Sequence, residues 1–191
     1  MIYLFPESCA YPGTIDRDFQ AQSKALAEKG CTVLPVNEKG KIIGNHDLYQ
    51  KALYRGWMMS FEEYQNFYHA VDDQGVYLTV NPGFYHRCHY ISGWYQRLQD
   101  LTIESVFFKS INEINESNIP AWNKYFVKDF VKSLTTKRGS VASNIDEIKE
   151  VASLIEQYRG RLDGGVCVRR FVNLQADSEE RYFVTLTPGV C

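Results

Sequence analysis

Apolar and polar positions in the first quarter of the chain switch between the spacing of strands and that of helices. An apolar run at residues 2–5 predicts a strand, and residues 16–29 follow a helical spacing that stops at Gly30. Residues 31–36 predict a second strand, and a third is expected at residues 49–54. This order of strand, helix and strand predicts an α/β layer.

The next stretch predicts a well-capped helix. Ser60 is expected to cap a helix over residues 61–72, and Glu63 stands in the capping-box position. A strand is expected to resume at residues 76–80.

An aromatic segment follows that strand. Asn81-Pro82-Gly83 is a strong turn signal, so a turn is expected there. Residues 84–101 are rich in aromatic side chains and irregular, with a short helix expected at about residues 92–98.

Three cations lie inside apolar strand patterns in the last third of the chain, at Lys128, Arg169 and Arg181. Strand alternation places each on a face with aromatic side chains: Phe126 and Phe130, Phe171, and Phe183 respectively. A charge on a buried face needs an anionic partner. Three such strands predict a single anion pocket, for which a polyphosphate is the natural ligand.

The alternative is a set of strands with one solvated face, where lysine and arginine are common. Arg170 is the weaker candidate because it alternates onto the opposite face.

The loop that follows the Lys128 strand adds a second signal. Residues 132–140 combine cations, hydroxyls and one glycine, a composition that suits a flap whose backbone N–H groups close over phosphates. The spacing is not that of a P-loop. A solvated hairpin tip is the alternative. Beyond it, Asn144 is expected to cap a helix over residues 146–158.

Composition and charge limit the class of protein. The chain has 191 residues, of which 45% are hydrophobic and 14% aromatic, as in a globular protein. Its net charge of −2 provides no general footprint for nucleic acid or an anionic membrane. The five cysteines are odd in number and form no Cys-x-x-Cys pair, which favours reduced thiols in the cytoplasm. The apolar start is too short for a signal or membrane segment. Residues 86–89 lack a second ligand pair, so no metal site is predicted.

The ordered series of segments resembles the ATP-grasp superfamily, and more narrowly its clade named for two arginines and a lysine. The series runs from the Lys128 strand through the flap and a helix to a Gly-Gly strand with arginines, then to the strand that begins Glu180-Arg181. Three N-terminal segments also match that clade: residues 1–6, 52–58 and 81–90. The resemblance covers nearly the whole chain.

The resemblance implies an α/β (α+β) fold in two parts. Residues 1–118 would form a pre-ATP-grasp α/β domain, and residues 119–191 the N-terminal part of an ATP-grasp domain. The polar stretch 112–118 is the expected boundary. Relatives continue for roughly a hundred residues more, so this chain is expected to be C-terminally truncated.

The resemblance also implies site residues. In such proteins the counterpart of Lys128 contacts phosphate, and the strand around residues 167–172 passes the adenine. The implied nucleotide-binding residues are Lys128, Lys132, Arg169, Arg170, Phe171, Val172 and Arg181. Arg170 would replace Arg169 if the strand register slipped by one residue. The first domain is expected to help bind the acceptor substrate, through Arg55, Arg87 and His89. No catalytic residue is assigned.

The function implied is that of a nucleotide-binding protein related to ATP-dependent carboxylate–amine ligases, which activate a carboxylate as an acyl phosphate and couple it to an amine or thiol. ATP and Mg²⁺ are the expected cofactors, yet no Mg²⁺ ligands are found in this chain. The alternative is therefore a non-catalytic module that binds nucleotide or a protein partner. RNA binding through Arg55, Trp57 and residues 84–95 is a weaker third hypothesis, because the net charge is −2.

The last expectation concerns the strand at residues 181–186. If the chain ends at residue 191, this strand lacks its usual neighbours and exposes an unpaired edge. Self-association, or a complementary chain, is expected at that edge.

Overall fold

The computed structural model describes residues 1–175, 177, 179 and 180. They fall into two compact units, of which the first is Met1–Thr102 and the second begins at Ile103. The division precedes the boundary expected after residue 118, because the strand at residues 105–108 pairs with the last described strand of the second unit, residues 166–170.

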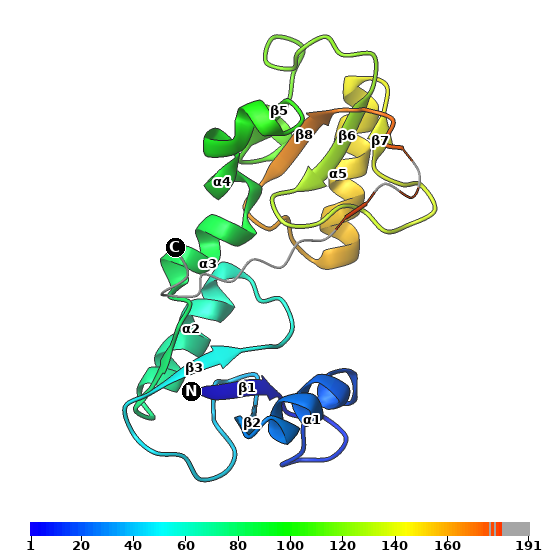
Figure 1. Ribbon diagram of the computed structural model, residues 1–191. Helices are drawn as coiled ribbons and strands as arrows, with labels where there is room; N and C mark the ends of the chain where they lie inside the picture. The colour runs from blue at the N-terminus through cyan, green and yellow to red at the C-terminus, as the bar shows by residue number, and fades with distance from the viewer. Residues whose placement is uncertain (176, 178, 181–191) are drawn as a thin grey trace, which may run out of the picture. The chain divides into compact units, whose positions relative to one another are not determined.

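The first unit contains a parallel sheet with helices on both faces (Figure 1). Its elements are β1 (Ile2–Pro6), η1 (Arg17–Phe19), α1 (Gln20–Glu28), β2 (Thr32–Val36), β3 (Gln50–Tyr54), α2 (Phe61–Asp72), β4 (Val76–Leu78), α3 (Pro82–His89), α4 (Ile91–Leu98) and η2 (Gln99–Leu101). The strand order is β2-β1-β3-β4, and all three pairings are parallel. This confirms the predicted α/β layer.

Strand alternation explains how the helices of the first unit are divided. Leu4 belongs to the core cluster that includes Phe67 of α2. The ring of Phe5, one residue further along β1, lies 6.1 Å from the ring of Phe19 in η1. Successive residues of a strand point to opposite faces, so η1 with α1 and α2 cover opposite sides of the sheet.

Two local signals in the first unit had different outcomes. The Ser60 capping box is confirmed: Ser60 Oγ accepts from Glu63 N at 3.3 Å, and Glu63 Oε2 accepts from Ser60 N at 2.7 Å. The expected turn at Asn81-Pro82-Gly83 is instead the start of α3, where Asn81 Oδ1 accepts from Phe84 N at 2.9 Å. Proline suits the first turn of a helix as well as a turn, so this signal was ambiguous.

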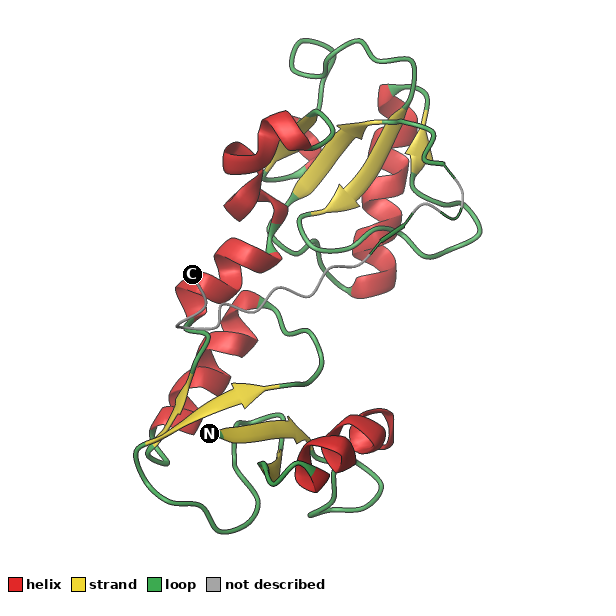
Figure 2. Ribbon diagram, in the orientation of Figure 1, coloured by secondary structure: helices red, strands yellow, loops and turns green. Residues whose placement is uncertain are grey.

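The second unit is an antiparallel sheet with one long helix, α5, against it (Figures 1 and 2). Its elements are β5 (Ser105–Phe108), η3 (Ile111–Glu113), β6 (Tyr125–Asp129), β7 (Val141–Ala142), α5 (Ile145–Arg159) and β8 (Val166–Arg170). The strand order is β5-β8-β6-β7. Asn144 caps α5 as predicted, with its Oδ1 accepting from Glu147 N at 2.9 Å.

The core of the second unit lies between α5 and one face of the sheet. Val127 of β6 and Val168 of β8 are fully buried there against Ile148 and Ile155 of α5. β8 can begin beside the end of β5 only with glycine at position 165. A Cβ on Gly165 would lie 2.2 Å from the backbone oxygen of Phe108, and its φ of +129° is open mainly to glycine.

Candidate functional site: the cation face of the second sheet

The sheet face opposite α5 carries two of the three predicted cations, Lys128 and Arg169. Directly paired residues share a face, and the register of β5, β8 and β6 therefore aligns two rows there. The first row is Phe107, Cys167 and Lys128, and the second is Ser105, Arg169 and Phe126. We call these six residues the cation face. It contains two cations and no carboxylate among its six positions.

The guanidinium of Arg169 is held over β5. Its Nε donates to Ser105 Oγ at 3.0 Å, and a terminal nitrogen donates to the backbone oxygen of Ile103 at 3.3 Å. Ser105 was not predicted as a site residue. Its contact with Arg169 depends on a pairing between residues 64 positions apart, which the local pattern does not reveal.

The ammonium of Lys128 lies in a partly buried position on the same face. Its Nζ donates to the backbone oxygen of Asp129 at 2.7 Å. Burial lowers the pKa of Lys128 from its ordinary value, and this effect outweighs the opposing charge of the neighbouring Asp129 carboxylate. The positive charges of Arg169 and Arg159 act in the same direction as burial. The protein therefore holds this charge at a cost, and an anion placed beside it would relieve that cost.

Cys167 lies between the two cations on β8 and is fully buried. Burial raises the pKa of its thiol to about 11, although Lys128 and Arg169 oppose that rise. The side chain is thus a neutral thiol at physiological pH. It contributes packing to the cation face rather than a nucleophile.

A buried ionic network fixes the end of β6 just after Lys128. The carboxylate of Asp129 is completely buried and accepts hydrogen bonds from the backbone N–H groups of Val131 and Lys132. It also pairs with Arg159 of α5, which in turn donates to Asp163 at 2.8 Å. These contacts tie the strand, the following turn and the end of the helix together, so the backbone at Lys128 is rigidly placed.

The loop over residues 132–140 is anchored at both ends rather than free along its length. Leu134 is buried, and its N–H donates to the Oγ of Ser140 at 3.0 Å. Arg138 donates to Glu150 of α5 at 3.2 Å and to the backbone oxygen of Val141 at 2.8 Å. Lys132 is exposed at the start of the loop. A phosphate-covering role for this loop stays a prediction.

The remaining nucleotide-site candidates differ in where they lie. Arg170 alternates onto the opposite side of β8, where its Nε lies 3.2 Å from Glu104. Phe171 donates its N–H to the backbone oxygen of Lys124 at 2.9 Å, and both Phe171 and Val172 are partly buried. The second predicted arginine, Arg181, lies outside the described residues, as does the strand expected at residues 181–186.

The three residues expected to bind the acceptor do not form one cluster in the first unit. Arg55 is exposed after β3, and its Nε donates to Gln22 at 3.4 Å. Arg87 is exposed on α3, with its guanidinium 5.3 Å from the ring centre of Phe84. His89 stacks on Tyr85 at 4.9 Å.

The described part of the chain contains neither a cluster of metal ligands nor a membrane-spanning helix. No group of three or more histidine, cysteine or acidic side chains there is placed to hold a metal ion. None of the described helices has the length and apolarity needed to cross a membrane.

Comparisons with known proteins place the fold. No family model matches the sequence. No curated protein matches it either. Among solved structures, a RimK domain ATP-grasp protein from Sphaerobacter thermophilus DSM 20745 matches 92% of this chain with a TM-score of 0.58 and 12% sequence identity. D-cycloserine synthetase DcsG matches 90% of the chain with a TM-score of 0.53 and 15% identity.

These matches cover 65% and 59% of the two solved chains, so this chain spans less than two thirds of the length of each. Identities this low support a common fold rather than a common activity. The mixed α/β architecture, with its parallel sheet followed by an antiparallel one, is shared with an ATP-grasp structure. Over the length that it spans, the chain therefore has the fold of the ATP-grasp proteins.

Proposed function

We propose that this chain binds the phosphates of ATP at the cation face, as part of a protein related to ATP-dependent carboxylate–amine ligases. One observation carries the proposal: Lys128 and Arg169 share a face whose paired rows contain no carboxylate. Burial is the main cause of the lowered pKa of Lys128, and it outweighs the opposing charge of Asp129. An anion is the ligand that would relieve this electrostatic cost.

The two cations differ in what they offer a polyphosphate. A guanidinium presents several N–H groups in a rigid plane and can bind two phosphate oxygens at once. An ammonium acts as a compact point charge. Arg169 is already oriented by Ser105, while the Asp129 network fixes the strand that carries Lys128. The pair would hold a phosphate chain in one place before any chemistry begins.

The proposal extends to the activity and location that the resemblance implies. In an ATP-dependent ligase, cations stabilise charge on the transferred phosphoryl group while a carboxylate becomes an acyl phosphate. Mg²⁺ would add to this charge stabilisation when bound. A cytoplasmic location stays a prediction based on the odd, unpaired pattern of cysteines in the sequence.

Calorimetric titration with ATP and with ADP tests the proposal. We expect binding by the full chain and a loss of at least about tenfold in affinity in Lys128→Ala and in Arg169→Ala, because each removes a charged hydrogen-bond donor. Lys149→Ala is the matched control, since α5 packs on the other face of the sheet. No heat with the wild-type chain, or equal weakening in the control, would contradict binding at the cation face.

A non-catalytic nucleotide-binding module is the second candidate, favoured by the lack of a metal-ligand cluster among the described residues. Release of phosphate from ATP, with Mg²⁺ and a mixture of carboxylates and amines, separates the two. Binding without phosphate release supports the module, whereas release that Lys128→Ala abolishes supports the enzyme.

A further inference from the structure

The first unit has a topology that creates a binding crevice. β1 pairs with β2 on one side and with β3 on the other, and the helices that follow β1 and β3 lie on opposite faces. In open parallel sheets of this kind the chain leaves neighbouring strands in opposite directions, which opens a crevice outside their carboxyl ends. Here that position is at the ends of β1 and β3.

A cavity occupies this position. Its volume is about 840 Å³, and the residues around it come from the segments that follow three parallel strands. Glu7 follows β1, Asn37 follows β2, and Trp57 follows β3. The volume suits a small organic molecule. We call this cavity the strand-end crevice.

The rim of the strand-end crevice is braced by its own polar side chains. Glu7 Oε1 accepts from Gly13 N at 2.7 Å, and Asn37 Oδ1 accepts from Lys41 N at 2.9 Å. Asp16 accepts from the backbone N–H of Asp18 at 2.9 Å. These bonds fix the loops in place, so the crevice is formed before any ligand arrives, which lowers the entropic cost of binding.

Charge sets the class of ligand. The lining includes the carboxylates of Glu7, Asp16, Glu38 and Glu63 and a single ammonium, from Lys39. A phosphate or carboxylate ligand would be repelled by this surplus of negative charge. A metal ion is not the fit either, because no group of three or more possible ligands is placed to hold one in the described part of the chain. An organic cation is the remaining charged class.

Apolar side chains at the rim indicate what accompanies that cation. Trp57 and Met58 line the crevice, and although both are large and hydrophobic they are 54% and 48% exposed. The ring of Phe19 packs against Trp57 at 4.8 Å and supports it from one side. An exposed, supported aromatic ring beside carboxylates offers both dispersion and cation–π contacts.

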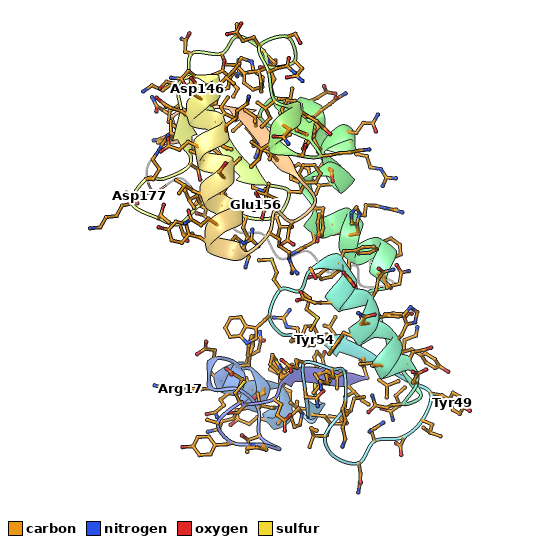
Figure 3. All side chains as sticks on the ribbon, turned by 180° about the vertical axis from the view of Figure 1, so that it is seen from behind. Arg17, Tyr49, Tyr54, Asp146, Glu156 and Asp177 are labelled. Carbon is orange, nitrogen blue, oxygen red and sulfur yellow. The ribbon has the colours of Figure 1, made fainter. Side chains whose placement is uncertain are left out.

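A smaller hollow extends the same surface. Its volume is about 190 Å³, and it shares Tyr54, Trp57 and Met58 with the strand-end crevice. Tyr85 and His89 line its other side. Figure 3 labels Tyr54 at the end of β3, where the two hollows adjoin. Burial raises the pKa of Tyr54 to about 12, so its ring is uncharged at physiological pH.

We propose that the strand-end crevice binds a small organic cation, a primary amine or guanidinium on an apolar body. The charged end lies among Glu7, Asp16 and Glu38, and the apolar body packs on Trp57 and Met58. The cavity and its place in the sheet define the site, while the carboxylates select the charge. This site lies wholly within the first unit, so it goes beyond the nucleotide binding proposed for the second.

The test uses three probes of similar size that differ in charge: 2-phenylethylammonium, 2-phenylethanol and 3-phenylpropanoate. Each is titrated into the full ¹⁵N-labelled chain while the indole N–H signal of Trp57, assigned with Trp57→Phe, is followed. We expect the ammonium probe to shift this signal and to bind about tenfold more tightly than the alcohol, with no measurable binding of the carboxylate.

Two charge-neutralising variants locate the site. Glu7→Gln and Asp16→Asn each keep a side-chain oxygen that can accept the loop hydrogen bond, so the rim should persist. Each is expected to weaken binding of the ammonium probe about fivefold. Glu62→Gln, an exposed change on α2 outside the crevice, is the matched control.

Three results would overturn the proposal: equal binding of the ammonium and alcohol probes, tighter binding of the carboxylate, or equal affinity in the two variants and the wild-type chain. ADP titration of the same variants keeps this question separate from the proposed nucleotide site. Unchanged ADP binding, with weakened binding of the ammonium probe, supports two independent sites.

Discussion

Replacing Lys128 with methionine is expected to stabilise the second unit while removing the proposed phosphate contact. Methionine keeps an unbranched side chain of similar length and removes the charge. The substitution loses one hydrogen bond, from Nζ to the backbone oxygen of Asp129 at 2.7 Å, which is worth about 1.5 kcal/mol. It also ends the burial of an ammonium near Arg169 and Arg159, which we take to cost roughly 2.5 kcal/mol for a partly buried charge.

The lowered pKa of Lys128 indicates which contribution is larger, because it means that the folded protein disfavours the charged form. We therefore expect Lys128→Met to raise the free energy of unfolding by about 1 kcal/mol at pH 7. The unfolded chain binds more protons than the folded one between the lowered pKa and the ordinary value of 10.5. The free energy of unfolding of the wild-type protein should thus rise with pH in that window. The difference in this free energy between Lys128→Met and the wild type should therefore become smaller.

Urea unfolding, followed by ¹⁹F NMR of 5-fluorotryptophan, measures the free energy of unfolding of the second unit separately from that of the first. Trp122 packs against the core of the second unit, whereas Trp57 lies in the first unit, so their signals separate the two transitions. Lys132→Met is the control, because Lys132 is exposed and its loss should change stability by less than about 0.5 kcal/mol. A Lys128→Met protein less stable than the wild type would show that the Lys128 ammonium stabilises the folded protein. That result would contradict the expected cost of burying this charge.

Three further experiments test other parts of the second unit. Asp129→Asn should lower the free energy of unfolding by about 3 kcal/mol in urea, because it removes the fully buried charge that pairs with Arg159 and leaves only Asp163 as that guanidinium's ionic partner. Glu156→Gln, an exposed change, should have almost no effect. Gly165→Ala should lower the free energy of unfolding by more than about 3 kcal/mol in the same assay, since its Cβ would lie 2.2 Å from the backbone oxygen of Phe108. Gly139→Ala, with open space around its Cβ, should lower it by about 1 kcal/mol. Equal losses in the two variants would contradict the close approach of β5 to Gly165. Cys167 should resist alkylation by iodoacetamide at pH 8 in the folded protein, because burial raises the pKa of its thiol to about 11. Mass spectrometry measures the rate at each cysteine, and alkylation of Cys167 as fast as that of the exposed cysteines would contradict its burial.

Local sequence patterns predicted the structural features that depend on one short segment, namely the helix caps and the faces of the strands. The capping box at Ser60 and the cap at Asn144 both depend on side chains three residues from the amide they bind, so the sequence contains the whole interaction. Strand alternation likewise placed Lys128 and Arg169 on the faces where they are found, because the period of two needs no knowledge of neighbouring strands.

Contacts between residues far apart in the sequence could not be predicted from local patterns. β5 belongs to the second unit through its pairing with β8, as in the pair Phe107 and Cys167, and composition gives no sign of that pairing. The helix α3 was missed because Asn81 and Pro82 begin helices as readily as turns. What favours the helix is packing, in which Tyr85 of α3 stacks on Tyr64 of α2 with ring centres 3.9 Å apart.

The strand-end crevice illustrates a third kind of information. Its acidic residues follow separate strands and are unremarkable in sequence, so nothing local marks Glu7 or Asp16 as neighbours. Only the parallel order β2-β1-β3 brings their loops to one edge. Polar residues directly after each predicted parallel strand were the available signal, and a search for them would have found Glu7 and Asn37.

The most direct test of the central claim is the pKa of the Lys128 ammonium, measured by NMR with and without ADP in protein labelled at the lysine side chains. Lys128→Met assigns the signal. Nucleotide phosphates beside the ammonium would stabilise its charged form. We therefore expect a lowered pKa in the free protein that rises on addition of ADP, with no change at Lys149. A Lys128 pKa that saturating ADP leaves unchanged would contradict phosphate binding at the cation face.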